Sequence, residues 1–270
     1  YSMSIYLIAV IVGIVEGITE FLPISSTGHM VIVGHMLGFD GPLANVFDVF
    51  IQLGAILSII FIYKERFAMF FTKEGWQLHG GFSVWHVAAG IVPVALVGLI
   101  LHGPIKHYLF SPYTVVIGLV TGSVLMMYAE NKMGVRNNQL LNDIDHLSIK
   151  QAAQIGAYQI FSLWPGFSRS GSTLAGGLLT GVSRDCSAKY TFIIAVPLMF
   201  MACIYDLLKN LKDLNSGDLL VLAIGFVVAF VVAYISVLWF LKFLHNSSLK
   251  AFAYYRIVLA VFTFFYFYTR

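Results

Sequence analysis

Charged residues are scarce in this sequence. Of its 270 residues only 11% are Asp, Glu, Lys or Arg, whereas 59% are hydrophobic and the mean hydropathy is +0.85. Soluble domains carry about 25% charged residues, and a single core of this size cannot bury so much apolar side chain. The composition therefore excludes an ordinary water-soluble domain and predicts a surface that faces lipid.

The sequence also lacks a basic cluster, a metal-binding cysteine pattern and segments of alternating apolar and polar residues. The net charge is only +3 and no cluster of basic residues is present, so no nucleic acid partner is expected. Cys186 and Cys203 have no metal-ligand spacing, which gives no support to a zinc site or a disulfide framework. The apolar runs are continuous and not alternating, so helices are favoured over a transmembrane β-barrel.

Six apolar stretches are long enough for a helix to cross the bilayer, which takes about 20 residues. The other apolar runs are too short and form two pairs, each interrupted by polar residues with Pro and Gly. We predict one all-α polytopic membrane domain over residues 1–270, with six transmembrane helices and two re-entrant helical hairpins. The six predicted spans are Asn45–Tyr63, Val84–His102, Pro112–Ala129, Ala188–Leu208, Leu219–Leu241 and Ala251–Tyr268.

The two hairpins resemble each other. The first surrounds the polar segment Glu16–His29 and the second surrounds Pro165–Thr173. A constant offset places Ser25 on Ser168 and also aligns several glycines, which indicates an internal duplication. Because three spans separate the copies, the second copy is expected to be inverted, with the binding site where the broken helices meet near the bilayer midplane.

This plan predicts pseudo-repeats 3–130 and 151–270, joined by a cytoplasmic linker at 131–150. Most Lys and Arg residues fall in the loops around 64–73, 131–150, 184–189 and 242–250. The positive-inside rule places these loops in the cytoplasm and both termini outside.

Glu16 and Glu20 lie four residues apart on one face of a short helix, where like charges repel. At membrane depth the repulsion grows, so either one carboxylate is protonated or a cation lies between them. The pair therefore predicts a functional site.

Hydroxyl groups and one histidine follow the acidic pair. Ser25, Ser26 and Thr27 precede a helix expected to begin near Gly28, whose free N–H groups and dipole favour an anion. His29 comes next and can move a proton near neutral pH, although a structural hydrogen bond is the alternative interpretation.

The second segment adds a permanent positive charge. Arg169 matches the geometry of phosphate oxygens, and an unpaired guanidinium in lipid is hard to justify structurally. Ser168, Ser170 and Thr173 surround it at another helix start. The two segments together predict an anion site in which Arg169 opposes two carboxylates, which would hold a proton or a divalent metal.

The two polar segments resemble the two signature motifs of the undecaprenyl-pyrophosphate phosphatases of the BacA type, without a gap in either, and the span layout agrees along nearly the whole chain. The resemblance implies an enzyme of the bacterial cytoplasmic (inner) membrane that hydrolyses undecaprenyl diphosphate to undecaprenyl phosphate and inorganic phosphate. This reaction recycles the lipid carrier for cell-wall synthesis and is linked with bacitracin resistance. The resemblance also implies dependence on Mg²⁺ or Ca²⁺ and a site open to the outer face, and it admits a homodimer.

The resemblance also assigns roles to residues of this chain. Glu16 and Glu20 become the metal-binding pair, with Glu20 also catalytic, and Arg169 becomes the diphosphate clamp. The nucleophile stays open between Ser26, His29 and water, with His29 otherwise the general acid for the leaving group. The residues assigned to substrate binding are Ser25, Thr27, Ser168, Ser170 and Thr173.

Two other functions are weaker. A transporter or flippase for an anionic polyprenyl lipid would use the same inverted repeats, but it would not need two carboxylates and a histidine at the site. An acid phosphatase of the paired-histidine type lacks the expected Lys and Arg-Pro element upstream.

Overall fold

The computed structural model describes residues 3–109, 111–135, 140–210 and 216–269. These residues form helices, and within the described ranges the only β contact is an isolated bridge between Leu141 and Val182. The α-helices are α1 (Ile5–Thr19), α2 (Ser26–Leu37), α3 (Pro42–Ile62), α4 (Lys64–Met69), α5 (Val84–Tyr108), α6 (Pro112–Val135), α7 (Ile149–Gln159), α8 (Arg169–Leu179), α9 (Arg184–Asn210), α10 (Leu219–Asn246) and α11 (Lys250–Tyr268).

Six of these helices are long and apolar enough to cross a membrane, which confirms the predicted number of spans. They are α3, α5, α6, α9, α10 and α11, and several extend beyond the predicted bounds. Helix α6 continues to Val135, so the first residues of the predicted linker 131–150 are helical. Residues 136–139 of that linker lie outside the described residues.

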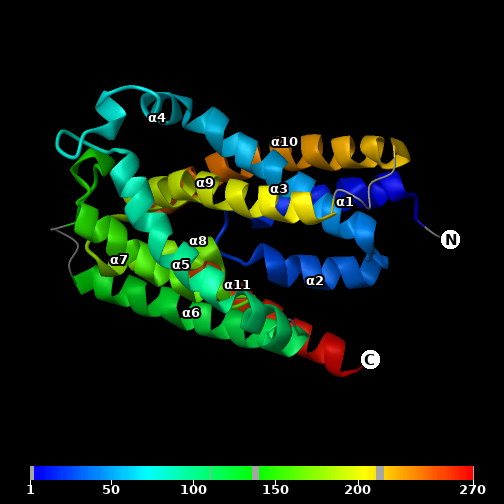
Figure 1. Cartoon of the computed structure of the whole chain (residues 1–270). Coiled ribbons are helices and arrows are strands. Elements are labelled where there is room, and N and C mark those ends of the chain that lie inside the picture. Colours follow the sequence, from blue (N-terminus) through cyan, green and yellow to red (C-terminus); the bar gives the residue numbers. More distant parts are fainter. Residues whose placement is uncertain (1–2, 110, 136–139, 211–215, 270) are drawn as a thin grey trace.

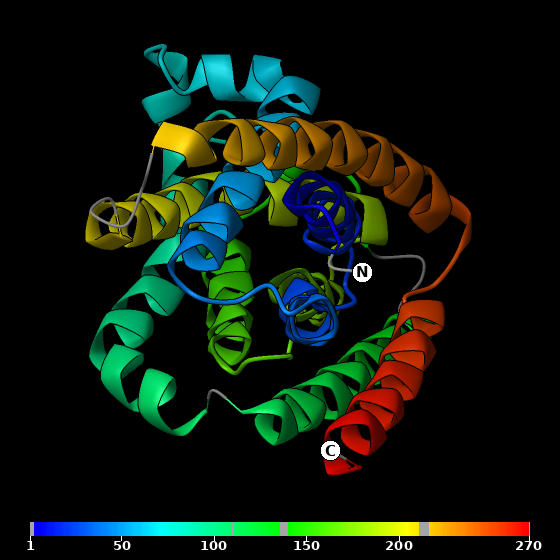
Figure 2. The same cartoon turned by 90° about the vertical axis from the view of Figure 1, so that its right-hand side faces the viewer.

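The long helices surround α1 and α2. Helix α10 packs on α3 and α1, α11 packs on α6, and α5 packs on α7. Figure 2 shows α1 and α2 inside the ring made by the longer helices. The start of α1 and the end of α11 lie at the same end of the molecule in Figure 1, as expected for termini on one side.

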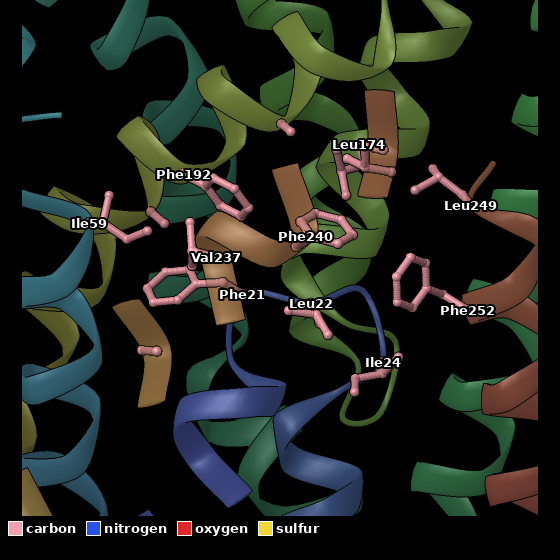
Figure 3. Close-up of a cluster of buried hydrophobic side chains, with 14 of the residues drawn as sticks. Phe21, Leu22, Ile24, Ile59, Leu174, Phe192, Val237, Phe240, Leu249 and Phe252 are labelled. Carbon is pink, nitrogen blue, oxygen red and sulfur yellow. The ribbon is translucent and has the colours of Figure 1, made fainter. Parts of the chain in front are cut away.

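The first break separates α1 from α2 at residues 20–25. Pro23 has no N–H to donate and disfavours helical geometry in the residue before it, so α1 cannot continue through it. Phe21, Leu22 and Ile24 are buried and point into the main apolar cluster beside Phe192 and Phe240 (Figure 3). The break is therefore held by apolar packing and not left as a loop.

The second break separates α7 and its short 3-10 extension, Ile160–Leu163, from α8. Trp164 precedes Pro165 and is extended, with ψ 119°, as the proline requires. Gly166 has φ 88°, and a Cβ there would lie 2.3 Å from the carbonyl oxygen of Val115. Glycine at 166 thus supplies both the turn and the close approach of the break to α6.

Both breaks end on the same unusual residue. Ser25 (φ 69°) and Ser168 (φ 77°) are the non-glycine residues with positive φ among those described. Each caps the helix that follows, since Ser25 Oγ accepts from Gly28 N at 3.2 Å and Ser168 Oγ accepts from Gly171 N at 3.1 Å. The sequence offset thus corresponds to a repeated local geometry, whereas the re-entrant insertion and the inverted arrangement of the halves stay predictions.

Candidate functional site

The two breaks meet through an ion pair. Arg169 Nη2, at the start of α8, donates to Glu20 Oε1 at 3.1 Å, and only 12% and 9% of the two side chains are exposed. The guanidinium also lies over the Phe21 ring, 5.8 Å from its centroid. The cation and one of the two acids predicted to oppose it are therefore in contact, in a place largely closed to water.

Ser26 completes a chain of three groups. Its hydroxyl donates to Glu20 Oε2 at 2.7 Å, so the carboxylate accepts from a serine on one oxygen and from Arg169 on the other. In an activated nucleophile, the hydroxyl is typically hydrogen-bonded to a base, and a third group orients that base. The hydroxyl pattern alone does not separate Ser25, Ser26 and Thr27, and only the family resemblance makes Ser26 a candidate nucleophile. The hydrogen bond to Glu20 is the structural observation that distinguishes it.

Two polar atoms near this ion pair have no partner among the described residues. Glu16 Oε1 and Arg169 Nη1 are buried and make no hydrogen bond to that part of the chain. Glu16 interacts electrostatically with Glu20, Asp48 and Arg169, which places it beside the same network. Unsatisfied buried polar groups are costly and are typical of places where a ligand or ion supplies the missing partner.

His29 contacts a residue that the sequence analysis did not single out. Its Nδ1 lies 2.8 Å from the Ser25 carbonyl, which can only accept, so Nδ1 carries the hydrogen. Its Nε2 lies 2.7 Å from the Tyr255 hydroxyl, and the two rings stack at 5.6 Å. Tyr255 belongs to α11, 226 residues away along the chain, so no local pattern could have identified it.

The other predicted substrate contacts occupy different environments. Ser170 is buried and donates to the Leu22 carbonyl of the first break at 3.0 Å, which ties the two breaks together. Thr173 is buried and bonds to backbone carbonyls of α8 and to Thr191. Thr27 is exposed. The substrate-binding roles of Ser25, Thr27, Ser168, Ser170 and Thr173 stay predictions.

A divalent metal would find two carboxylates here. Among the described residues no group of three or more His, Cys, Asp and Glu side chains could hold a metal ion. Mg²⁺ commonly uses only one or two carboxylates and completes its shell with water and substrate phosphate. The unpartnered Oε1 of Glu16 beside Glu20 fits that kind of site, which would be completed by the substrate.

Comparison with known proteins identifies the family of this chain. The family model described as "Bacitracin resistance protein BacA" matches residues 9–262. "Undecaprenyl-diphosphatase 1" of Bacillus cereus is 48% identical over 260 residues, which cover 96% of this chain and 97% of the relative. Proteins of the same name from Bacillus thuringiensis (strain Al Hakam) and Bacillus anthracis are 48% and 47% identical over 260 residues, with the same coverage of each chain. With both motifs placed at one site and the match extending over nearly its whole length, the chain belongs to the BacA family.

Proposed function

We propose that this multi-pass membrane protein is an undecaprenyl-diphosphatase, which removes the terminal phosphate from undecaprenyl diphosphate and so recycles the lipid carrier for cell-wall synthesis. The observation that carries the proposal is the network Ser26–Glu20–Arg169, built from both breaks. The names of the relatives, which match this chain almost end to end, support the choice of substrate.

Arg169 and two helix ends bind the diphosphate. The N-termini of α2 and α8 present N–H groups that have no partner within their helices, and helix N-termini favour anions. The unpartnered Nη1 of Arg169 adds a charged donor at the same place. The apolar tail would then extend into lipid, since the ring of long helices exposes many apolar side chains.

Ser26 attacks the terminal phosphorus with Glu20 as its base. The Ser26 Oγ–P bond forms, the bridging P–O bond breaks, the serine proton passes to Glu20, and undecaprenyl phosphate leaves. Water then attacks the phosphoserine, and His29, which has given its own proton to the leaving phosphate, accepts the proton of that water. Glu20 returns the serine proton to Ser26 Oγ as the Oγ–P bond breaks, and inorganic phosphate is released. The 2.7 Å hydrogen bond from Ser26 to Glu20 supports this route over direct attack by water, because the hydroxyl is already paired with the base.

His29 protonates the leaving phosphate in this scheme. Its protonated form can donate from Nε2 once the bond with Tyr255 is given up, while Nδ1 keeps its bond to the Ser25 carbonyl. Glu16 and Glu20 would hold Mg²⁺ or Ca²⁺, which supplies positive charge to phosphate oxygens when bound.

The location of the enzyme follows the same proposal. It lies in the bacterial cytoplasmic membrane with both termini outside and the site open to the outer face, which agrees with the loop charges. If the two halves are inverted as the sequence predicts, the interrupted helices at corresponding places would meet at a site at membrane depth. A homodimer is compatible with this arrangement.

The test is phosphate release from undecaprenyl diphosphate by the purified protein in detergent. We expect turnover with added Mg²⁺ or Ca²⁺, loss with EDTA, and a decrease of about 100-fold or more in Arg169→Ala. The matched control is Arg66→Ala, because Arg66 pairs with Asp145 away from both breaks. Wild-type turnover in Arg169→Ala, or no phosphate release by the wild-type protein, would refute the proposal.

A carrier function is the second candidate, because broken helices at corresponding positions are also a transporter plan. The same preparation in vesicles distinguishes the two. Movement of a polyprenyl phosphate across the bilayer without phosphate release would favour the carrier.

A further inference from the structure

Arg256 is a second buried guanidinium close to the site. It lies in α11 and is 0% exposed. Within the described residues no carboxylate pairs with it, in contrast to Arg66, Arg169 and Arg184. A buried charge without a counter-ion is costly unless hydrogen bonds replace its water, so its position needs a reason.

Its hydrogen bonds go to backbone carbonyl groups of three separate segments. Nη2 donates to Phe167 O at 2.8 Å and to Gly166 O at 3.1 Å, both in the second break. Nη1 donates to Pro23 O, in the first break, at 3.3 Å. Nη2 also contacts the carbonyls of Gly118 and Leu119 in α6, each at 3.2 Å. One side chain of α11 therefore connects both breaks and a neighbouring span.

Helix α6 is shaped to admit this guanidinium. A Cβ at Gly122 would lie 2.3 Å from Arg256 Nη2 and 2.5 Å from the Phe167 carbonyl oxygen. A Cβ at Gly118 would lie 2.2 Å from the Pro165 carbonyl oxygen. Two glycines one helical turn apart thus let the second break and Arg256 approach the α6 backbone.

The Arg256 hydrogen bonds fix the direction in which the turn peptides point, and this direction affects where an anion can bind. In a trans peptide the N–H points away from the C=O, so the Phe167 carbonyl faces Arg256 while the N–H of Ser168 faces the opposite way. The negative ends of the turn peptides are thereby bound to a cation. Arg256 is also close enough to His29 to interact with it electrostatically.

We infer that Arg256 is a positioning residue for the phosphatase reaction. By holding Pro23 of one break and Gly166 and Phe167 of the other, it fixes how Ser26 and Glu20 stand relative to Arg169. It acts through these residues and does not touch the reacting phosphate. The inference rests on the proposed function, because it assumes that these three residues act on the substrate.

The first experiment compares Arg256→Lys and Arg256→Gln with the wild-type protein, with kcat and KM measured per folded molecule. We expect kcat to fall about 10-fold in R256K and about 100-fold in R256Q, because a displacement near 1 Å can cost that much. KM should change by less than about 3-fold, because Arg169 still binds the diphosphate. Wild-type kcat in folded R256Q overturns the inference, and so does a loss of stability with unchanged kcat.

A substitution in α6 can disturb the same contact between Arg256 and Phe167 without changing Arg256 itself. Gly122→Ala places a methyl group against Arg256 and Phe167, whereas Gly134→Ala, in the same helix, has no atom of the described residues within 4 Å of its added Cβ. We expect kcat to fall about 10-fold or more in G122A and to stay unchanged in G134A. If R256Q yields no folded protein, the positioning role of Arg256 is tested with R256K and G122A. Wild-type kcat in both of these variants overturns the inference.

The outcome for Arg169→Ala separates two kinds of failure. Normal turnover in R169A means that the proposed site is wrong. Loss of turnover in R169A together with normal kcat in the Arg256 and Gly122 variants leaves the proposed function intact and removes only the positioning role.

Discussion

The first and second breaks have the same backbone design but contribute different chemistry. Each contains a proline and ends on a serine with positive φ that caps the next helix. The first break adds carboxylates, a hydroxyl and an imidazole, whereas the second adds a guanidinium. In the proposed function, the repeated backbone supplies two helix ends for the diphosphate, and the divergent side chains supply an acid–base group on one side and a clamp on the other.

The positive φ values indicate that the backbone at Ser25 and at Ser168 is strained and that other contacts must stabilise it. Non-glycine residues in sparsely populated backbone regions cost about 1–3 kcal/mol each and persist where surrounding contacts determine them, often at functional sites. Here the surrounding contacts are the caps, the apolar packing of the first break and the bonds from Arg256.

The largest predicted effect comes from removing Ser26, the proposed nucleophile, which follows the first break. Ser26→Ala should reduce phosphate release about 1,000-fold or more, because the remaining groups can only bind and polarise the substrate. Ser170→Ala, at a hydroxyl of the second break, should reduce it far less, since Ser170 bonds to the Leu22 carbonyl. Acid quenching with substrate labelled in its terminal phosphate should trap label on the wild-type protein and none on S26A. Equal losses in S26A and S170A would remove the proposed division of roles.

A smaller effect is expected at the tyrosine that contacts the first break. Tyr255→Phe removes the hydroxyl 2.7 Å from His29 Nε2 but keeps the stacked ring. We expect kcat to fall about 3- to 10-fold with KM little changed, because His29 loses one of its two hydrogen bonds but keeps the stacking contact. The kcat and KM of Y255F and H29Q should be compared, and a larger loss in Y255F than in H29Q would contradict a role acting through His29.

The equivalence of the two caps predicts equal losses of stability. Ser25→Ala and Ser168→Ala should each destabilise the protein by about 1 kcal/mol, because a cap is lost while the positive φ remains. Ser168→Gly should cost less, because glycine adopts positive φ without strain. Thermal unfolding in detergent tests this expectation. A several-fold difference between S25A and S168A would show that the two turns are not equivalent.

The smallest effect concerns an Arg–carboxylate pair outside both breaks. Arg66 donates to Asp145 at 2.5 and 2.8 Å, and this hydrogen-bonded guanidinium holds the pKa of Asp145 below its usual range. Such a depressed pKa contributes stability above the unfolded-state value, about 3.9, and this contribution is lost as the pH falls through the folded-state value.

Arg66→Gln should therefore lower the free energy of unfolding by no more than about 1 kcal/mol at pH 7, because the pair is partly exposed. The difference from wild type should decrease as the pH falls below about 3.9 and vanish only below the folded-state pKa of Asp145. Unfolding curves from pH 7 down to about pH 2 test this, with phosphate release unchanged at pH 7. A difference that stays constant over this whole range, or lost activity at pH 7, would contradict the contrast with the buried Glu20–Arg169 pair.

The sequence predicted the parts of the structure that depend on local pattern. The six spans follow from the length of apolar runs, and both breaks follow from Pro23 and Pro165 within polar segments. The meeting of Arg169 with Glu20 could be predicted because a buried guanidinium needs a partner and the first break offers carboxylates.

The contacts that complete the site could not be predicted in this way. Tyr255 and Arg256 lie in α11, where one resembles an interfacial aromatic residue and the other a stray charge within a span. Their roles depend on the packing of α11 against α6 and on the carbonyl groups that the breaks expose. The family resemblance makes Ser26 a candidate nucleophile, but its hydrogen bond to Glu20 depends on the turn at Ser25, which no residue pattern predicts.

The most direct test of a site assembled from both breaks is a double-mutant cycle on Glu20 and Arg169. Phosphate release should be measured for Glu20→Gln, Arg169→Gln and the double variant under saturating substrate. Residues that act as one unit show strongly non-additive losses, so the double variant should be no more than about 10-fold slower than the slower single variant. Losses that multiply across the two positions would show that the two breaks work independently and would contradict the account.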